Sequence, residues 1–142
     1  MKINPEPPKT LSAALRLALT DFKIILSRPD LYIVDMADWH RQDLYGVKCR
    51  VCLAGAVLAC TFEPGIITVN INAYGDEWRD TFFAINELRS GYVEEAVQEF
   101  NVEGYEANTE DREVASYESD PEQFIRDMEQ LLADLEANET TA

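Results

Sequence analysis

The chain has 142 residues, of which 46% are hydrophobic and 10% aromatic, a composition that excludes wholesale disorder and fits one domain with a buried core. Its formal net charge is −15, and residues 91–142 hold 16 Asp/Glu against 2 Lys/Arg, which leaves −14 in that third alone. This charge disfavours direct binding to nucleic acid or to an anionic membrane.

The N-terminal part predicts a short leader followed by a helix. Residues 1–9 are rich in proline and cannot form helix interior. A single globular domain is predicted over residues 10–137. Thr10 or Ser12 is expected to cap the first helix, and Pro29 to end it. The buried stripe of this helix is predicted from apolar residues at spacings of three and four: Leu11, Leu15, Ala18, Phe22 and Ile25.

The middle of the chain predicts two short strands around a buried central helix. The aromatic and β-branched run Leu31–Met36 and the later run Ile66–Ile71 are typical of strands. The polar residues 37–47 between them predict a loop. Arg50–Phe62 carries no charge after its first residue, which is typical of a helix at the centre of a domain.

Two helices and an acidic loop are predicted next. Asp76 is expected to cap a helix that runs to about Ser90 and ends at Gly91. Tyr92–Phe100 predicts a short amphipathic helix, and residues 102–119 predict an acidic loop because they show neither helical nor strand periodicity. The inner face of the first of these helices is predicted to carry Trp78, Phe82, Ile85 and Leu88.

An acidic helix is predicted at the C-terminal end. Asp120–Gln123 combines a capping residue with proline in the first turn, a strong helix start. Residues 138–142 are expected to fray. One stripe is predicted to be buried, namely Phe124, Met128, Leu131, Leu132 and Leu135, while Asp127, Glu129, Asp134 and Glu136 are expected to face away from it. The predicted fold class is α+β, a helix-dominated single domain with two short strands.

The side chains best suited to chemistry are one histidine and three cysteines: His40, Cys49, Cys52 and Cys60. Cys49 and Cys52 form a C-x-x-C pair, but the sequence around them does not predict the βαβ unit in which redox motifs of this kind occur. A shared zinc ion is disfavoured because Cys52 and Cys60 are two turns apart on the predicted helix. We therefore expect no metal, no cofactor and no catalytic residue. The alternative is a Cys–His hydrolase with Cys52 or Cys49 as nucleophile and His40 as base.

Two stretches resemble small uncharacterised proteins of bacteriophages and prophages. The first is the pair Trp39-His40 followed by the V-C-L-A-G-A-V segment at Val51–Val57, and the second is the helix-like run Ala84–Gly91. The resemblance covers residues 31–91. It implies a phage protein that acts inside a bacterial cell, and it assigns no catalytic or binding role to any residue.

The charge distribution then predicts the kind of partner. We expect a non-enzymatic protein that binds a basic surface of a host protein, as an inhibitor or a nucleic-acid mimic, through Asp127, Glu129, Asp134 and Glu136. Self-association is left open. A cytoplasmic location is expected because three cysteines without an export signal indicate a reducing compartment. The longest apolar run, Val51–Cys60, is about half of the ~20 residues that a membrane span needs.

Overall fold

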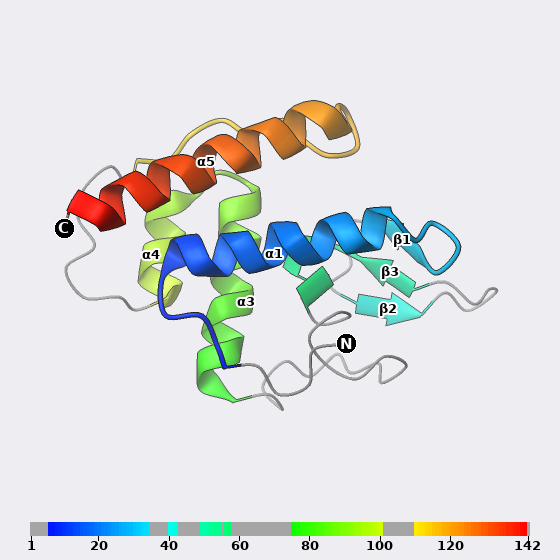
Figure 1. Cartoon of the computed structure of the whole chain (residues 1–142), viewed down its shortest axis with the longest axis horizontal. Coiled ribbons are helices and arrows are strands. Elements are labelled where there is room, and N and C mark those ends of the chain that lie inside the picture. Colours follow the sequence, from blue (N-terminus) through cyan, green and yellow to red (C-terminus); the bar gives the residue numbers. More distant parts are fainter. Residues whose placement is uncertain are drawn as a thin grey trace.

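A computed structural model describes residues 6–34, 40–42, 49–54, 56–57, 75–100 and 110–141. Helices dominate this part of the chain, as predicted (Figure 1). The elements are α1 (Leu11–Leu26), β1 (Tyr32–Val34), β2 (His40–Gln42), β3 (Cys49–Val51), α3 (Asp76–Arg89), α4 (Val93–Phe100) and α5 (Pro121–Thr141). None of the helices described is both long and apolar enough to cross a bilayer.

Helix α1 forms where the sequence predicts it. The Thr10 side chain accepts a hydrogen bond from the backbone N–H of Ala13 at 3.1 Å, which satisfies one of the open donors of the first turn. Ser27 closes the other end, shortly before Pro29. All five residues of the predicted stripe are buried, with 0–1% of their surface exposed, so the prediction for this helix is confirmed: Leu11, Leu15, Ala18, Phe22 and Ile25.

The three strands form one small sheet in the order β1–β3–β2, with β3 parallel to β1 and antiparallel to β2. Two predictions are corrected here. Residues 40–42 are a strand and not part of a loop, and Cys49–Val51 is the central strand and not the start of a helix. Helical backbone begins only at Leu53. The predicted strand Ile66–Ile71 lies outside the described residues.

Helical backbone does follow within the apolar run, but it begins at Leu53, three residues later than the predicted start at Arg50. The described residues of this run are fully or almost fully buried: Cys52, Leu53, Ala54, Ala56 and Val57. A short apolar run is compatible with a buried strand or a buried helix, so periodicity alone cannot place the switch from one to the other. The remainder of the predicted helix up to Phe62 lies outside the described residues.

Helices α3 and α4 are joined by a tight turn at Gly91. The N–H of Gly91 donates to the carbonyl of Leu88 at 2.9 Å, and the N–H of Tyr92 donates to that of Glu87 at 3.0 Å. These two bonds form a Schellman motif, which requires a left-handed residue, and Gly91 has φ = 83°. At the other end Asp76 is the first helical residue and not the predicted cap, because Gly75 occupies the cap position. The predicted inner face of α3 is confirmed: Trp78, Phe82, Ile85 and Leu88 are buried.

Helix α5 begins at Pro121, with the Asp120 side chain accepting from the N–H of Gln123 at 3.1 Å. Its stripe packs inward as predicted for Phe124, Met128, Leu131 and Leu135, and Leu132 is partly buried. Residues 138–141, which the sequence predicts to fray, are helical in the structure, because α5 continues to Thr141. The reason is a tertiary contact of Glu139, described below.

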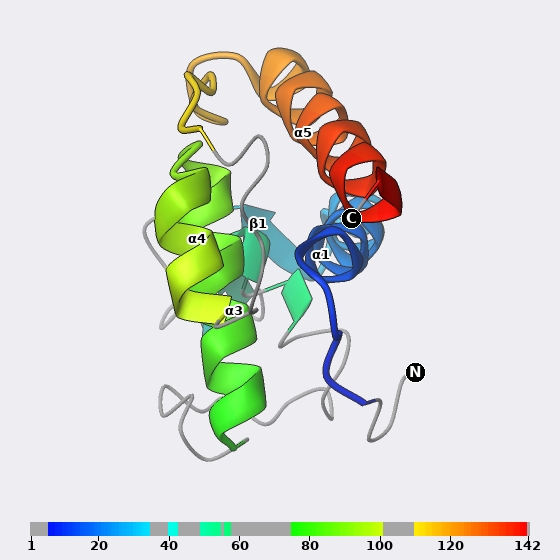
Figure 2. The same ribbon diagram turned by 90° about the vertical axis from the view of Figure 1, so that its left-hand side faces the viewer.

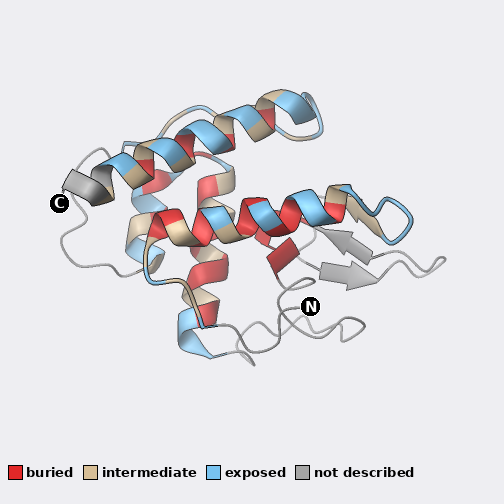
Figure 3. Cartoon of the chain, viewed as in Figure 1, coloured by how far each residue is buried: buried red, intermediate tan, exposed pale blue. Residues whose placement is uncertain are grey.

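The core lies between α1 and its neighbours. Helix α1 packs against α5 on one side and against α3 and α4 on the other (Figure 2). The segment 110–119, which has no helix or strand, crosses between α4 and α5 and contributes Tyr117 to a cluster of aromatic rings with Phe22 and Phe124, at centroid distances of 5.5–6.2 Å. Buried positions follow the inward faces of the helices and exposed positions follow the outward faces (Figure 3).

Candidate functional site

Each of the four carboxylates predicted to bind a partner contacts a group within its own chain. Glu129 forms an ion pair with Lys23 at 3.2 Å, and Asp134 forms one with Arg112 at 2.6 Å. Glu136 forms an ion pair with Arg16 of α1. Asp127 accepts from the backbone N–H of Ala115 at 3.0 Å and from the Gln123 side chain at 2.7 Å. These four side chains therefore do not form one solvated face pointing away from the fold.

Three of the α5 carboxylates form a charged seam along α1. Glu129 pairs with Lys23, Glu136 with Arg16, and Glu139 with Ser12. Residue numbers thus rise along α5 as they fall along α1. The two helices are thus antiparallel. At the end of the seam Glu139 accepts from the backbone N–H and from the hydroxyl of Ser12, so its charge lies in the first turn of α1. A carboxylate is stabilised there by the open N–H groups and by the helix dipole.

The carboxylates around α4 are arranged differently. Glu94, Glu95 and Glu99 are exposed, and none of them forms an ion pair within the described part of the chain. The backbone N–H of Glu94 donates to the Asp111 side chain at 3.1 Å, which holds a further carboxylate beside the first turn of the helix. Together with Glu87 at the end of α3 these five residues form a surface that we call the α4 acidic face.

The pKa of Glu87 is set by its partial burial and by the neighbouring charges of this face. Partial burial is the largest cause that raises the pKa of Glu87 above its ordinary value, and the charges of Glu95 and Glu99 raise it further. Arg89 opposes the rise, and Asp111 adds to it. The pKa of Asp134 on α5 moves in the opposite direction, chiefly because Arg112 donates a hydrogen bond to it. The two acidic regions thus differ in kind, since three of the four α5 carboxylates pair with cations, whereas those of the α4 acidic face form no ion pair with any residue that the structure describes.

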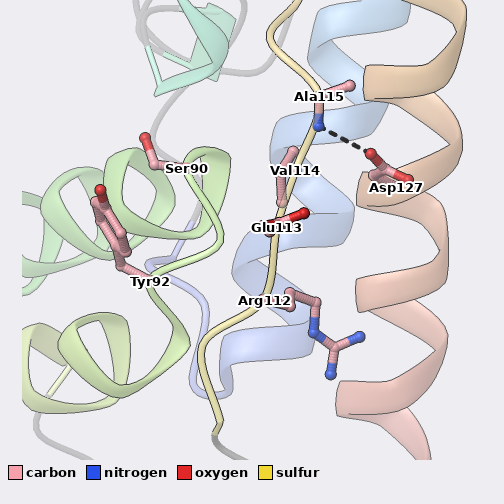
Figure 4. A pocket seen from close by; sticks show the side chains of 7 residues that line it. All are labelled: Ser90, Tyr92, Arg112, Glu113, Val114, Ala115 and Asp127. Carbon is pink, nitrogen blue, oxygen red and sulfur yellow. Dashed lines mark hydrogen bonds between the residues drawn. The ribbon is translucent and has the colours of Figure 1, made fainter.

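A groove of about 620 Å³ adjoins the α4 acidic face. Figure 4 shows Ser90 and Tyr92 on one wall, at the turn between α3 and α4, with the segment from Arg112 to Ala115 opposite them. Tyr92 is 51% exposed, the largest fraction among the large hydrophobic side chains described. The Arg112 side chain points toward α5, where it meets Asp134, and so its charge is directed away from Tyr92.

The residues of the Cys–His alternative are only partly brought together. The register pairs His40 with Val51, so the backbone of His40 lies beside the residue that precedes Cys52. Cys52 itself is 1% exposed. Cys49 lies in the central strand, where it is paired with Gln42 and Tyr32, and so it lacks the helix N-terminus expected of a reactive thiol. Cys60 lies outside the described residues, as do the side chains of His40 and Cys49.

Within the ranges that the structure describes, no group of three or more His, Cys, Asp or Glu side chains is arranged to hold a metal ion. Sequence reasoning missed the α4 acidic face and Tyr92 as candidate site residues. One signal was available, because Glu95 and Glu99 stand four residues apart on a predicted helix and must share a side of it. The groove had no such signal, since its two walls come from segments about twenty residues apart in the chain.

Comparisons with protein-family models, with curated proteins and with solved structures return no match. The resemblance of residues 31–91 to small phage proteins therefore stays a prediction.

Proposed function

We propose that this chain is a non-enzymatic phage protein that binds a basic surface of a host protein in the bacterial cytoplasm, as an inhibitor or nucleic-acid mimic. The domain is assigned to the α+β class, and its helices present the binding surface. It places the first contact on the α4 acidic face. Asp127, Glu129, Asp134 and Glu136 are secondary contacts, because each already has a partner in its own chain.

The observation that carries the proposal is that the charges at Glu95 and Glu99 destabilise helix α4. Glu95 and Glu99 are like charges at i and i+4, an arrangement that destabilises a helix. Glu99 lies in the last turn of a helix that has no basic residue there, where the helix dipole disfavours a negative charge. Glu94 and Glu95 in the first turn are favourable for the same helix. The arrangement around Glu99 therefore has no stabilising role within the described fold, and a cationic partner would remove the repulsion.

The chemistry of the face fits a surface that otherwise holds phosphate groups. Carboxylates accept hydrogen bonds from lysine and arginine as phosphate oxygens do. Clustered charge of one sign also accelerates encounter with an oppositely charged partner, by about 10- to 1,000-fold. A protein that binds in this way competes with nucleic acid for the same partner.

A paired charge reversal tests the proposal. Glu95→Lys with Glu99→Lys changes the charge of the α4 acidic face, and Glu6→Lys with Glu77→Lys makes the same change on exposed residues at the leader and at the far end of α3. Each variant and the wild type would be immobilised and exposed to bacterial lysate in low and high salt, and the retained proteins would be quantified by mass spectrometry.

A host protein should be retained by the wild type and by the control variant, released by high salt and by added double-stranded DNA, and lost with the α4 variant. Retention that is unaffected by the α4 reversal and by salt would refute binding through this face. Release by salt but not by DNA would support a basic partner and refute the nucleic-acid mimic.

The Cys–His hydrolase stays the second candidate because β2 and β3 pair His40 with the neighbour of Cys52. The burial of Cys52 opposes it, since a nucleophile must be reached by its substrate. Native alkylation with iodoacetamide, followed by mass spectrometry, distinguishes the two cases. We expect Cys52 to react only after unfolding, and rapid labelling of the folded protein would favour the hydrolase.

A further inference from the structure

The groove beside the α4 acidic face is open to solvent, and its surfaces suit a basic side chain. Its volume of about 620 Å³ exceeds that of any single amino-acid side chain. The half-exposed ring of Tyr92 and the side chain of Val114 supply apolar surface on opposite walls. Surface of this kind can hold the hydrocarbon stem of a lysine or arginine.

The charges at the groove select a cation. Glu113 is an exposed carboxylate on the segment opposite Tyr92, and it makes no ion pair with any residue described. Asp127 also lines the groove, at the α5 side, where it accepts hydrogen bonds from the N–H of Ala115 and from Gln123. Arg112, the cation among the described residues of the lining, is paired with Asp134. Charge complementarity thus favours a positive group over an anion or an uncharged side chain.

We infer that the groove between the α3–α4 turn and segment 112–115 receives an arginine or lysine side chain of a basic protein segment, with the Tyr92 ring against the cation and Glu113 as its counter-charge. Cations are attracted to the faces of aromatic rings, and arginine also stacks on them. The inference rests on the proposed function and adds to it a definite binding pocket. The α4 acidic face would guide the segment, and the groove would hold it.

The test uses a synthetic peptide of alternating arginine and serine, with a peptide of alternating glutamate and serine as the charge control. Binding to the full ¹⁵N-labelled chain would be followed by NMR at about 0.1 M salt, where electrostatic attraction still reaches ~10 Å. The variants are Tyr92→Ala, Tyr92→Phe and Glu113→Gln. Ile24→Ala is the matched control, because Ile24 is also a large apolar side chain, 46% exposed, on α1.

The expected result is a set of shift changes centred on Ser90, Tyr92 and residues 113–115. Tyr92→Ala should weaken binding by about two- to fivefold, the loss expected for an exposed cation–π contact, whereas Tyr92→Phe and Ile24→Ala should leave the affinity unchanged. Glu113→Gln should weaken binding and reduce its dependence on salt. The glutamate peptide should not bind.

Two results would overturn the inference. If shift changes fall only on α4 and Tyr92→Ala binds as the wild type does, the groove is not the pocket, although the proposed function would stand. If the arginine peptide does not bind at all, the pocket is refuted directly. The proposed function fails separately, when charge reversal on α4 leaves the capture of host protein unchanged.

Discussion

Gly91 is required at its position for two independent reasons. Its backbone has φ = 83°, a conformation that L side chains disfavour. A Cβ at this position would also lie 1.9 Å from the carbonyl oxygen of Arg112, while the N–H of Arg112 donates to the carbonyl of Gly91 at 3.0 Å. One glycine thus both ends α3 and lets segment 110–116 approach the turn that forms the groove.

Replacement of Gly91 by alanine should destabilise the fold by roughly 2–5 kcal/mol, combining about 1–2 kcal/mol for the left-handed backbone with about 1–3 kcal/mol for overpacking. Gly75→Ala is the matched control. Gly75 has φ = 95°, yet nothing lies within 4 Å of its Cβ position, so its cost comes from the backbone alone. Urea unfolding measures both, and hydrogen exchange at the Arg112 amide should accelerate only in the Gly91 variant. Equal effects would show that the contact with Arg112 relaxes freely.

Glu87 tests whether an ionised carboxylate on the α4 acidic face opposes folding, through its partial burial and the charges of Glu95 and Glu99. Its pKa in the folded state is raised, so ionisation of Glu87 opposes folding; the penalty is absent below its ordinary pKa of 4.5 and complete above the raised value. Glu87→Gln should therefore raise the melting temperature at pH 7, and this gain should disappear as the pH falls below the ordinary glutamate range. Glu6→Gln, an exposed position in the leader, should change neither value. A loss of stability at pH 7 in the Glu87 variant would contradict the assignment.

At the scale of the elements, α5 is attached to the fold by an apolar stripe with charges on its flanks. Leu131 is 1% exposed within the stripe, while its neighbour Leu132 is only partly buried. The ion pairs to α1 are exposed pairs, each contributing at most about 1 kcal/mol, so the stripe must supply most of the attachment.

Leu131→Ala should cost about 2–5 kcal/mol, the range for large-to-small changes at a buried site. Leu132→Ala should cost clearly less, because less of its surface is removed from water. Circular dichroism during thermal unfolding gives both values. If the Leu131 variant melts like the wild type, α5 would be a projecting arm whose stripe is reserved for a partner.

Elements with local signals could be predicted from the sequence, and elements defined by distant contacts could not. The stripes and caps of α1 and α5 are visible in a few consecutive residues, as is the glycine stop of α3. Strand β2, with the sequence His-Arg-Gln, has no strand periodicity and exists because β3 pairs with it. The sequence predicts that residues 138–142 fray. The contact of Glu139 with Ser12, 127 residues away, cannot be predicted from neighbouring residues.

The candidate site was predictable in its charge but not in its location. Composition showed that residues 91–142 are acidic, and the spacing on α5 correctly separated carboxylates from the apolar stripe. It could not show which carboxylates meet cations of α1 or of segment 110–119. Arg16 and Lys23, 120 and 106 residues from their partners, pair with two of the four carboxylates that the sequence predicts to bind a partner.

For the whole molecule, a net charge of −15 sets long-range repulsion against a few short-range ion pairs. The pairs lie at the surface, with most of their side chains 30–90% exposed, and each is worth little. The repulsion among unpaired carboxylates extends over the Debye length, about 30 Å at 0.01 M salt and about 10 Å at 0.1 M. Repulsion should therefore dominate the response of the fold to salt.

The melting temperature should accordingly rise as sodium chloride is increased from about 0.01 M to about 0.1 M, because the screened repulsion outweighs the weakened pairs. Glu95→Lys with Glu99→Lys should melt higher than the wild type at low salt and respond less to added salt, because it lowers the net charge from −15 to −11 and places cations among the remaining carboxylates of the α4 acidic face. Arg16→Gln, which breaks an ion pair with Glu136 instead, should melt lower and keep the full salt response. Differential scanning calorimetry of the three proteins at each salt concentration measures these melting temperatures. A wild-type melting temperature that falls with salt would mean that the α1–α5 ion pairs, and not the unpaired face of α4, govern the electrostatics of this fold.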